Sequence, residues 1–385
     1  MTSTTFLNDD ERYAASIAAL GAGPARLRRF LEGYEPRAAW DALARGRHPA
    51  DPEARYRSKA RPALVDAVEA RCAGRGIGVR ILGRSGYPAT LAADHEAPGV
   101  LFTLGDPSFI DSRPRVAIVG TRSATPYGLS VASELGAALS EAGVVVISGL
   151  ARGIDSAGHA GVLAASQGAP PVAVIGTALD APARQAERQL QQGVAQTGAV
   201  LSERAPGSTG TPVWLFAVRS RIMAALAHVV VVVECHRKGG SLNTVKCAVD
   251  RGVAVAAVPG SVRSSASMGC NALLVDGAVP VRDVGDVIAA VELAIAGRSE
   301  ILPPRSPDRA PFVRGGTAHG AEGSARALNR ISARTLDALD HDPASLDAIV
   351  GRCALPLTDV ALALEQLAAA GLASGAGGWW SRQGR

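Results

Sequence analysis

The residues of this chain best suited to chemistry lie in five loops made mostly of small residues. Their sequences are GTRS (120–123), SGLARGID (148–155), GTALD (176–180), KGGSLNT (238–244) and PGS (259–261). Each loop follows an apolar run, and several lead into a helical pattern. Free backbone N–H groups, the positive end of a helix and a guanidinium fork suit the capture of an anion, phosphate above all. The alternative is that the glycines only form tight turns between strands and helices.

Elements of two kinds must position these loops. From Val116 to about Val281, apolar β-branched runs alternate with helical stretches such as 129–142. The expected strands are 116–119, 144–147, 172–175, 199–201, 229–233 and 253–258. Such continuous runs are typical of a parallel sheet covered on both faces. The pattern predicts an α/β fold, an extended Rossmann-like doubly wound sheet, with its ligand at the carboxyl ends of the strands.

The segments on either side of this core have other patterns. Residues 1–77 predict an N-terminal domain of short amphipathic helices, followed by the core at 78–296. Residues 297–324 are rich in Pro, Gly, Ser and Arg and predict a flexible linker. Residues 325–385 predict a C-terminal winged-helix domain. Its third helix, expected at 358–371, carries Asp359 and Glu365 without Lys or Arg, which favours contact with a protein over reading of duplex DNA.

Composition narrows the class of protein. The chain has 385 residues, 47% of them hydrophobic, with a net charge of +5, so it is not a disordered chain. Its longest obvious apolar run, 229–233, is too short to span a bilayer. The N-terminus is polar and acidic and does not resemble a signal peptide, so we expect a cytoplasmic protein without membrane contact. Five cysteines without a CxxC pair are expected to be reduced thiols.

Enzyme signatures are missing from the sequence. It has no GxGxxG after the first strand, no GxxxxGK[ST] and no GxSxG. Asp155 and His159 could form an acid–base pair, but we expect Asp155 to cap a helix and His159 to be a satisfied, partly buried side chain. The residues Cys235, His236, Cys247 and Cys270 lack the spacing of a metal site. We therefore expect no catalytic residue, no metal and no cofactor.

The ordered loops resemble those of the DprA/Smf family, DNA-processing proteins of bacterial natural transformation. The similar stretch runs from about Tyr87 to Ala278 and includes VGTRSATPYG (119–128), FAVRSRIMAAL (216–226) and GGSLNT (239–244). The resemblance implies a non-catalytic protein that binds and protects incoming single-stranded DNA, forms a homodimer and loads the RecA recombinase. The physical pattern agrees, because binding without sequence preference needs dispersed phosphate contacts.

Residue by residue, the family's Gly-Ser/Thr-Arg falls on Gly120, Thr121 and Arg122, and its Arg-Asn-Arg on Arg219, Ser220 and Arg221. The chain departs from the family pattern at Ala178, Ala217, Ser220, Gly239 and Val245, and over Ala181–Gln185. The candidate DNA- and phosphate-binding residues are Gly120, Thr121, Arg122, Ser148, Gly149, Arg152, Gly153, Gly176, Phe216, Arg219, Ser220, Arg221, Lys238, Gly240, Ser241, Thr244, Pro259 and Gly260. The candidate supporting residues are Asp155, His159, Glu203 and Glu234.

Two other functions stay open on the sequence. A nucleoside-monophosphate phosphoribohydrolase of the LOG type has a similar sheet, but the loop 238–244 lacks that family's leading proline and its glutamate three residues beyond the threonine. The second alternative is an interaction scaffold that has lost its ligand, which the residues at 217 and 220 would allow.

Overall fold

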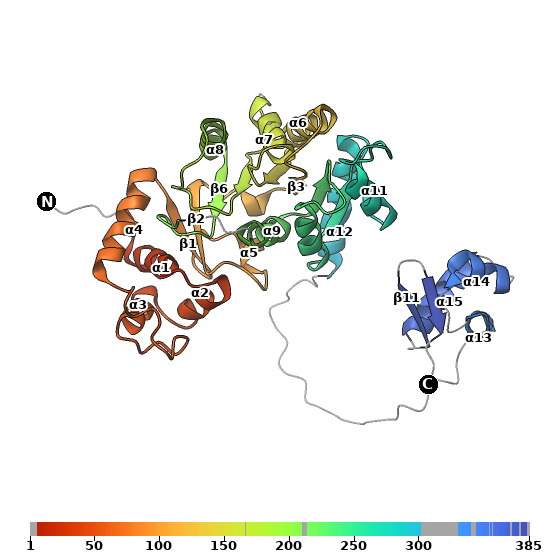
Figure 1. Ribbon diagram of the computed structural model, residues 1–385, viewed down its shortest axis with the longest axis horizontal. Coiled ribbons are helices and arrows are strands. Elements are labelled where there is room, and N and C mark those ends of the chain that lie inside the picture. The colour runs from red at the N-terminus through yellow and green to blue at the C-terminus, as the bar shows by residue number, and fades with distance from the viewer. Residues whose placement is uncertain are drawn as a thin grey trace, which may run out of the picture. The chain divides into compact units, whose positions relative to one another are not determined.

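The computed structural model describes residues 6–165, 167–209, 214–301, 330–339, 344–353, 355, 357–369, 372–376 and 379–382. The chain divides into two compact units, residues 1–303 and residues 304–385 (Figure 1). Within the described ranges, no helix combines the length and the hydropathy needed to cross a membrane.

A nine-stranded sheet forms the centre of the larger unit, with the order β1-β2-β6-β5-β4-β3-β7-β8-β9. The strands are β1 (Gly78–Ile81), β2 (Val100–Gly105), β3 (Arg115–Val119), β4 (Val145–Ser148), β5 (Val172–Val174), β6 (Ala199–Ser202), β7 (Val229–Val232), β8 (Ala254–Ala257) and β9 (Val279–Pro280). The neighbours from β6 to β9 pair in parallel, whereas β1 and β2 pair antiparallel with each other and β2 with β6. The expected α/β sheet of mostly parallel strands is confirmed.

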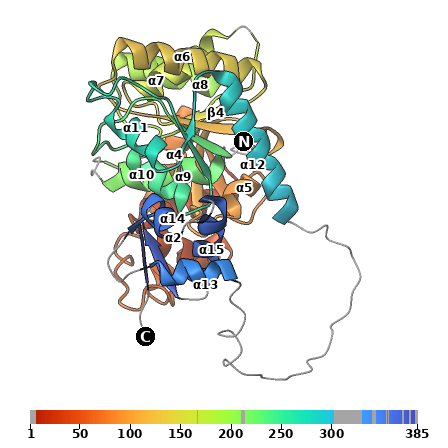
Figure 2. The same cartoon turned by 90° about the vertical axis from the view of Figure 1, so that its right-hand side faces the viewer.

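Helices cover both faces of this sheet (Figures 1 and 2). They are α1 (Asp9–Ala19), α2 (Pro24–Leu31), α3 (Pro36–Ala44), α4 (Pro62–Arg75), α5 (Ala89–Ala92), α6 (Pro126–Glu141), α7 (Ile154–Ala164), α8 (Gln185–Thr197), α9 (Trp214–Leu226), α10 (Leu242–Val249), α11 (Met268–Val275) and α12 (Val284–Ile301), with a 3-10 turn at Ile110–Ser112. Successive strand side chains point to opposite faces. In β3, Val119 accordingly packs in one core with Ile222 of α9, and Ile118 packs in another with Leu135 of α6.

The N-terminal helices share a third core with the sheet. Ile17 of α1 and Phe30 of α2 are fully buried in one cluster with Phe102 of β2 and Val200 of β6. Residues 1–77, expected as a separate domain, therefore lie in the same compact unit as the sheet. This packing covers the antiparallel end of the sheet, on the side of α8.

The C-terminal segments form a small unit of their own. It contains α13 (Arg330–Asp337), β10 (Ala344–Ser345), α14 (Leu346–Cys353), α15 (Leu357–Ala369), β11 (Ala373–Ala376) and β12 (Trp379–Arg382). Its strands pair antiparallel in the order β10-β12-β11, and Ile349, Val360 and Leu364 lie in its core. The expected linker begins later than predicted, because α12 continues to Ile301. Residues 302–324 of that linker lie outside the described residues.

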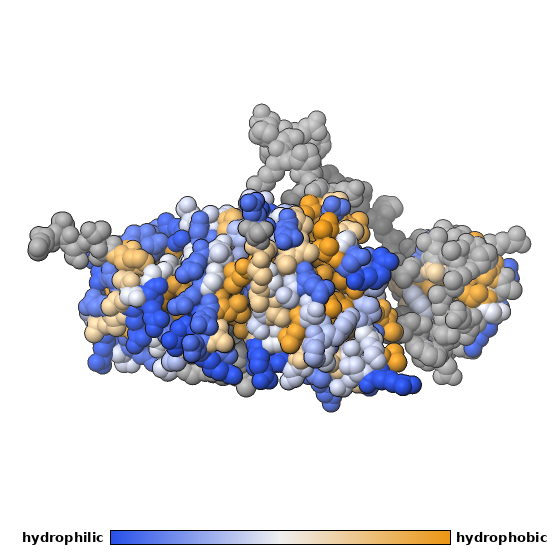
Figure 3. Space-filling view, turned by 90° about the horizontal axis from the view of Figure 1, so that it is seen from above, coloured by the Kyte–Doolittle hydropathy of each residue, from blue (hydrophilic) through white to orange (hydrophobic). Residues whose placement is uncertain are grey.

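The face of the larger unit shown in Figure 3 is mixed in character. Hydrophilic residues cover much of it, with hydrophobic patches between them. The most exposed large hydrophobic side chains of the described residues include Val262, Val275 and Leu293, all from the segment that follows β8.

Candidate nucleic-acid interface

The loops after β3 and β7 meet where the strand order of the sheet reverses. The chain runs from β3 outward through β4, β5 and β6 on one side, and from β7 through β8 and β9 on the other. The backbone N–H of Thr121 donates to the carbonyl of Glu234 at 2.8 Å and joins the two loops. In open α/β sheets this reversal is where ligands bind, because the loops diverge and leave a crevice.

Two adjoining cavities occupy this position, and together we call them the edge groove. The first, of about 440 Å³, lies between the loop after β3 and the loop before α10, and its lining includes Gly120, Thr121, Lys238 and Ser241. The second, of about 500 Å³, is lined by residues from the loops after β4 and β5, Gly149 and Gly176 among them. Arg122, Ala151 and Arg219 line both cavities.

Glycine at three loop positions is required by close packing. A Cβ at Gly120 would overlap Ile154, and one at Gly149 would overlap the guanidinium of Arg219. Gly153 has φ +94°, in the region that favours glycine, and a Cβ there would overlap the carbonyl oxygen of Thr121. These contacts bring the loops after β3 and β4 against each other and define the floor of the groove.

Glu234, at the end of β7, holds the loop after β3 in place. Its carboxylate is buried and accepts hydrogen bonds from the backbone N–H of Thr125 at 2.9 Å and from its hydroxyl at 2.6 Å. The Thr125 hydroxyl oxygen also accepts from the N–H of Gly128 and caps α6. The carboxylate thus satisfies hydrogen-bond donors of the loop after β3 and fixes the backbone from which the Arg122 side chain extends.

Arg219 of α9 reaches the edge groove as part of a buried ion pair. Its Nη1 donates to the carbonyl of Gly149 at 2.7 Å, and its Nη2 lies 3.3 Å from Oδ2 of Asp155. Burial raises the pKa of Asp155, and the guanidinium of Arg219 and the loop N–H groups oppose this shift. Burial lowers the pKa of Arg219, and the negative charge of Asp155 opposes that shift. Since the side chain of Arg219 is only 12% exposed, its main effect is to position the loop after β4.

The exposed cations of the groove are Arg122, Arg152, Arg184 and Lys238, and Nε of Arg184 lies 3.4 Å from Oε1 of Glu187. The loops after β3 and β4 hold Arg122 and Arg152 near each other, because Nε of Arg152 donates to the carbonyl of Arg122 at 3.2 Å. The carboxylates in the lining are those of Asp155, which is buried against Arg219, and Glu187 at the outer end. A groove with cations on its rim and small residues on its floor suits a chain of phosphates.

Twelve of the eighteen candidate binding residues line the edge groove. They are Gly120, Thr121, Arg122, Gly149, Arg152, Gly176, Arg219, Ser220, Lys238, Gly240, Ser241 and Thr244. Gly153 packs under it, and Ser148 is buried and donates to the carbonyl of Ile118 at 2.6 Å. Pro259 and Gly260 lie after β8, where Asn271 holds the backbone of Gly260. The side chain of Phe216 lies outside the described part of the chain.

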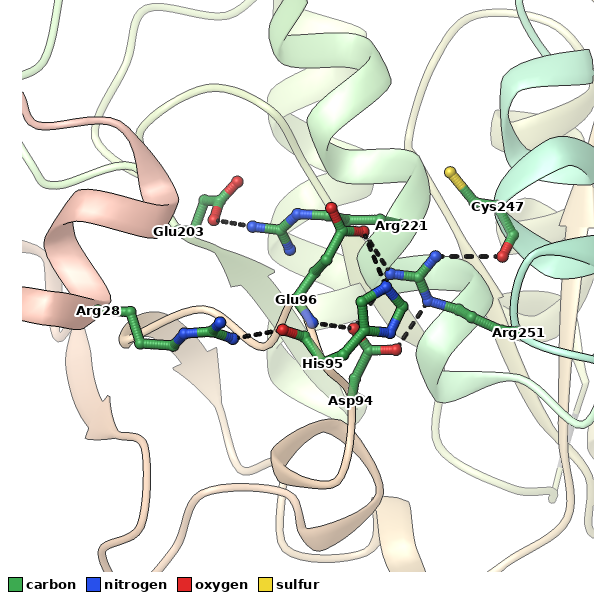
Figure 4. A network of polar contacts seen from close by, with 8 residues as sticks. All are labelled: Arg28, Asp94, His95, Glu96, Glu203, Arg221, Cys247 and Arg251. Atoms are coloured by element: carbon green, nitrogen blue, oxygen red, sulfur yellow. Dashed lines mark hydrogen bonds and ion pairs between the residues drawn. The ribbon is translucent and has the colours of Figure 1, made fainter. Parts of the chain in front are cut away.

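Arg221 lies away from the edge groove, which differs from the expectation. It lines another cavity with Arg28, His95 and Cys247, and its Nη2 is 2.6 Å from Oε2 of Glu203 (Figure 4). Both side chains are largely buried, and burial raises the pKa of Glu203, opposed by Arg221. Arg221 and Glu203 therefore join α9 to the end of β6.

Asp155 and His159 do not form an acid–base pair in the groove. Gly153, and not Asp155, is the N-cap of α7, and Asp155 accepts from the N–H of Gly149 at 3.2 Å instead. His159 is fully buried, Nε2 contacts the carbonyl of Val172 at 3.1 Å, and burial lowers its pKa to about 4. Among the described residues, no group of His, Cys, Asp or Glu could hold a metal ion.

Several lining residues were not singled out from the sequence. His236 and Asn243 line the first cavity, while Arg184, Glu187 and Gln191 line the second. His236 and Asn243 lie on either side of Gly239 and Gly240 in the sequence, and this position next to a pair of glycines was a signal that could have identified them. The other three lie at or in α8, and their sequence shows only a polar helix.

The chain is similar to known proteins over this core. The sequence model of one family, described as DNA recombination-mediator protein A, matches residues 79–292. A putative DNA processing protein DprA of Mycobacterium tuberculosis is 41% identical over 208 residues, which cover 54% of this chain and 53% of that protein. The DNA processing protein DprA of Streptococcus pneumoniae is 37% identical over 206 residues, covering 54% and 71%.

A solved structure agrees with these sequence comparisons. The X-ray structure of DprA from S. pneumoniae superimposes with a TM-score of 0.62 at 29% identity, and the match covers 72% of this chain and 97% of that chain. The chain spans about half the length of the M. tuberculosis relative that it matches.

Proposed function

Because the chain belongs to the DNA recombination-mediator protein A family, also called DprA or Smf, we propose that it binds single-stranded DNA in the edge groove. The observation that carries this proposal is the position of Arg122, Arg152 and Lys238 on the rim of a groove at the strand reversal. Contacts from guanidinium, ammonium and backbone N–H groups to phosphates need no particular base sequence. Arg219 and Glu234 act as positioning residues.

The partners in this proposal follow the family resemblance. The protein passes its bound strand to the RecA recombinase and works as a homodimer. It needs no cofactor and catalyses no reaction. The C-terminal unit is proposed to be a winged helix that contacts a protein, since the sequence of α15 carries Asp359 and Glu365 without Lys or Arg, and acidic side chains repel phosphate.

The structure gives little support to the nucleotide-hydrolysing alternative. The loop 238–244 carries Ser241 and Thr244 into the groove without a glutamate. The one carboxylate of the first cavity, Asp155, is buried against Arg219. Incubation with nucleoside monophosphates, followed by chromatography of the released bases, would reverse this conclusion if turnover were seen.

The proposed function predicts that R122A/K238A weakens binding of an oligo-dT strand by at least tenfold. Two exposed cations are removed, and each phosphate contact on a single strand adds about 0.7 to the slope of log K against log salt. Fluorescence anisotropy at two salt concentrations gives both the affinity and the slope. The circular dichroism spectrum should stay unchanged because both side chains are exposed.

The matched control is R26A/R57A, which removes two exposed arginines that line neither cavity of the groove. This variant should keep the wild-type affinity. Equal retention of oligo-dT by R122A/K238A and by the control would reject the edge groove as the DNA site.

A further inference from the structure

A further cavity adjoins the edge groove but is not part of it. It measures about 750 Å³, and we call it the flank trench. One wall is the face of α8, the other is the end of α4, and Leu104 and Gly105 of β2 contribute to the lining between them. Figure 1 shows α4 to the left of β2 and α8 above β6, and both helices contribute to one core with Phe102 of β2 and Val200 of β6. The trench therefore runs along the flank of the sheet, where the N-terminal helices pack.

The flank trench continues from the edge groove. Ala183 and Gln191 line both, so the two spaces adjoin at these residues. The loop after β5, from Leu179 to Ala183, is the corner around which one leads into the other. A single DNA strand that lies across the loops after β3, β4 and β5 would enter the flank trench at this corner.

One face of α8 gives the trench its chemistry. Its lining residues on α8 are Arg188, Gln191, Gln192, Ala195 and Gln196. These positions recur every three or four residues and so share one side of the helix. From Arg188 to Gln196 the helix rises about 12 Å, the length of roughly three stacked nucleotides at about 3.4 Å each.

The charges of the trench favour a polyanion. Arg75 at the end of α4 and Arg188 on α8 are exposed. The carboxylate in the lining is that of Asp180, whose side chain is 6% exposed and is held by Arg71 at 3.0 Å and by the N–H of Gly207 at 3.0 Å. Two accessible guanidinium groups thus face a space whose one acid is already neutralised.

We propose that the flank trench binds the nucleotides of the same DNA strand that extend beyond the edge groove. This inference rests on the proposed function and adds a path and a length to it. Arg75 and Arg188 contact phosphates, and the amides of Gln191, Gln192 and Gln196 contact base edges. An amide both donates and accepts hydrogen bonds, so it tolerates any base. None of the trench's lining residues is aromatic, so bases are held there by hydrogen bonds and not by ring stacking.

The experiment compares a short and a long strand, dT6 and dT20, on the full chain. Affinities come from anisotropy of labelled dT20 and from its competition with unlabelled dT6. We expect R75A/R188A to weaken dT20 about five- to tenfold and to change dT6 less than twofold. Its salt slope for dT20 should fall by about 1.4, for two contacts at about 0.7 each. The charge-preserving R75K/R188K should restore most of the dT20 affinity.

The outcomes separate this inference from the proposed function. If R122A/K238A loses both strands while R75A/R188A keeps wild-type affinity for dT20, the edge groove stands and the trench is rejected. Equal losses of dT6 and dT20 in R75A/R188A would also reject the trench, because that pattern reports a general loss of charge. If the wild-type chain binds neither strand, both proposals fail. The control R26A/R57A should match the wild type at both lengths.

Discussion

At the scale of single residues, two arginines of one helix have separate tasks. Arg219 and Arg221 are two positions apart on α9, and two helical residues are rotated by about 200°. Arg219 consequently faces the loops after β4, while Arg221 faces the opposite side and pairs with Glu203. Removing either partner of such a buried pair would leave a lone charge at a cost of about 3–5 kcal/mol. Both arginines are therefore poor targets for a test of DNA binding, and exposed cations are better ones.

Burial of His159 predicts that the protein loses stability in mild acid. Burial lowers the folded-state pKa to about 4 from 6.5. Between these values the unfolded chain binds a proton that the folded chain does not, so unfolding is favoured as the pH falls from 6.5 towards 4. A shift of this size corresponds to about 3 kcal/mol. Urea unfolding at a series of pH values should show this loss in the wild type.

The control for this prediction is H159Q, which cannot take up the proton and keeps an N–H that could donate to Val172. Its stability at pH 7 would fall by the packing cost, but the part of the acid loss due to His159 should disappear. An identical pH dependence in the wild type and in H159Q would contradict the assignment. His48, whose pKa is also lowered by burial, adds a loss that is common to both proteins.

The sequence identified those residues of the edge groove that contribute through their backbone, for which the direction of a side chain does not matter. Gly120, Gly149 and Gly176 contribute through the backbone, which the strand-end position alone determines. The direction of a long side chain depends on helix phase and on partners distant in sequence. That is why Arg221 was misplaced, since its partner Glu203 lies eighteen residues earlier in the chain, directly after β6. The prediction that Asp155 caps α7 was wrong for a similar reason. Its side chain accepts from the backbone N–H of Gly149, which lies in the loop before that helix.

At the scale of elements, the loops after β3 and β4 form one packed unit beneath the edge groove. The carbonyl of Thr121 accepts from the N–H of Ile154 at 3.2 Å, and Gly153 turns the chain so closely that a side chain has no room. Glu234 holds the other end of the loop after β3 through Thr125. The rim cations are therefore set by contacts between loops and not by the sheet alone.

This packing predicts that G153A weakens DNA binding as well as stability. The added Cβ would strain a backbone with φ +94° and overlap the carbonyl of Thr121, which moves Arg122. We expect a stability loss of about 2 kcal/mol and a several-fold weaker affinity for dT20. Thermal unfolding and anisotropy measure the two effects.

Gly143 provides the matched control, because it has φ +80° with no atom within 4 Å of an added Cβ. G143A should lose about 1 kcal/mol from backbone strain and keep its affinity for dT20. If G153A also kept wild-type affinity, the loop contact would not control the groove.

The elements themselves were largely readable from the sequence. All six parallel strands expected between 116 and 258 are present within one or two residues, because buried strands need continuous apolar runs. The antiparallel β1 and β2 were not predicted as strands, since β1 pairs with β2 and β2 pairs with β6, which lies far along the chain. The end of α12 was missed because residues 297–301 lack apolar periodicity, although the helix continues through them.

At the scale of the whole molecule, the sheet ends in an edge that suits a second copy of the chain. β9 is the last strand of the order, with α11 packed on one face of the sheet and α12 on the other. Val275 of α11 is 87% exposed and Leu293 of α12 is 75% exposed. An edge strand flanked by apolar side chains is a common site of association. This supports the proposed homodimer.

The dimer proposal predicts that V275D/L293D is a monomer. Burying two carboxylates at an apolar contact costs several kcal/mol per protomer unless they are paired, so association should weaken by at least a hundredfold. Light scattering after size exclusion should give about twice the chain mass of 39.3 kDa for the wild type and the single mass for the variant. F6D, which alters an exposed hydrophobic residue at the other end of the unit's chain, should remain dimeric. A monomeric wild type would reject the proposed dimer. A variant that stays dimeric would place the dimer contact elsewhere on the chain. A monomeric V275D/L293D that still binds dT6 with wild-type affinity would show that each edge groove is complete within one chain, as the lining residues from a single protomer imply.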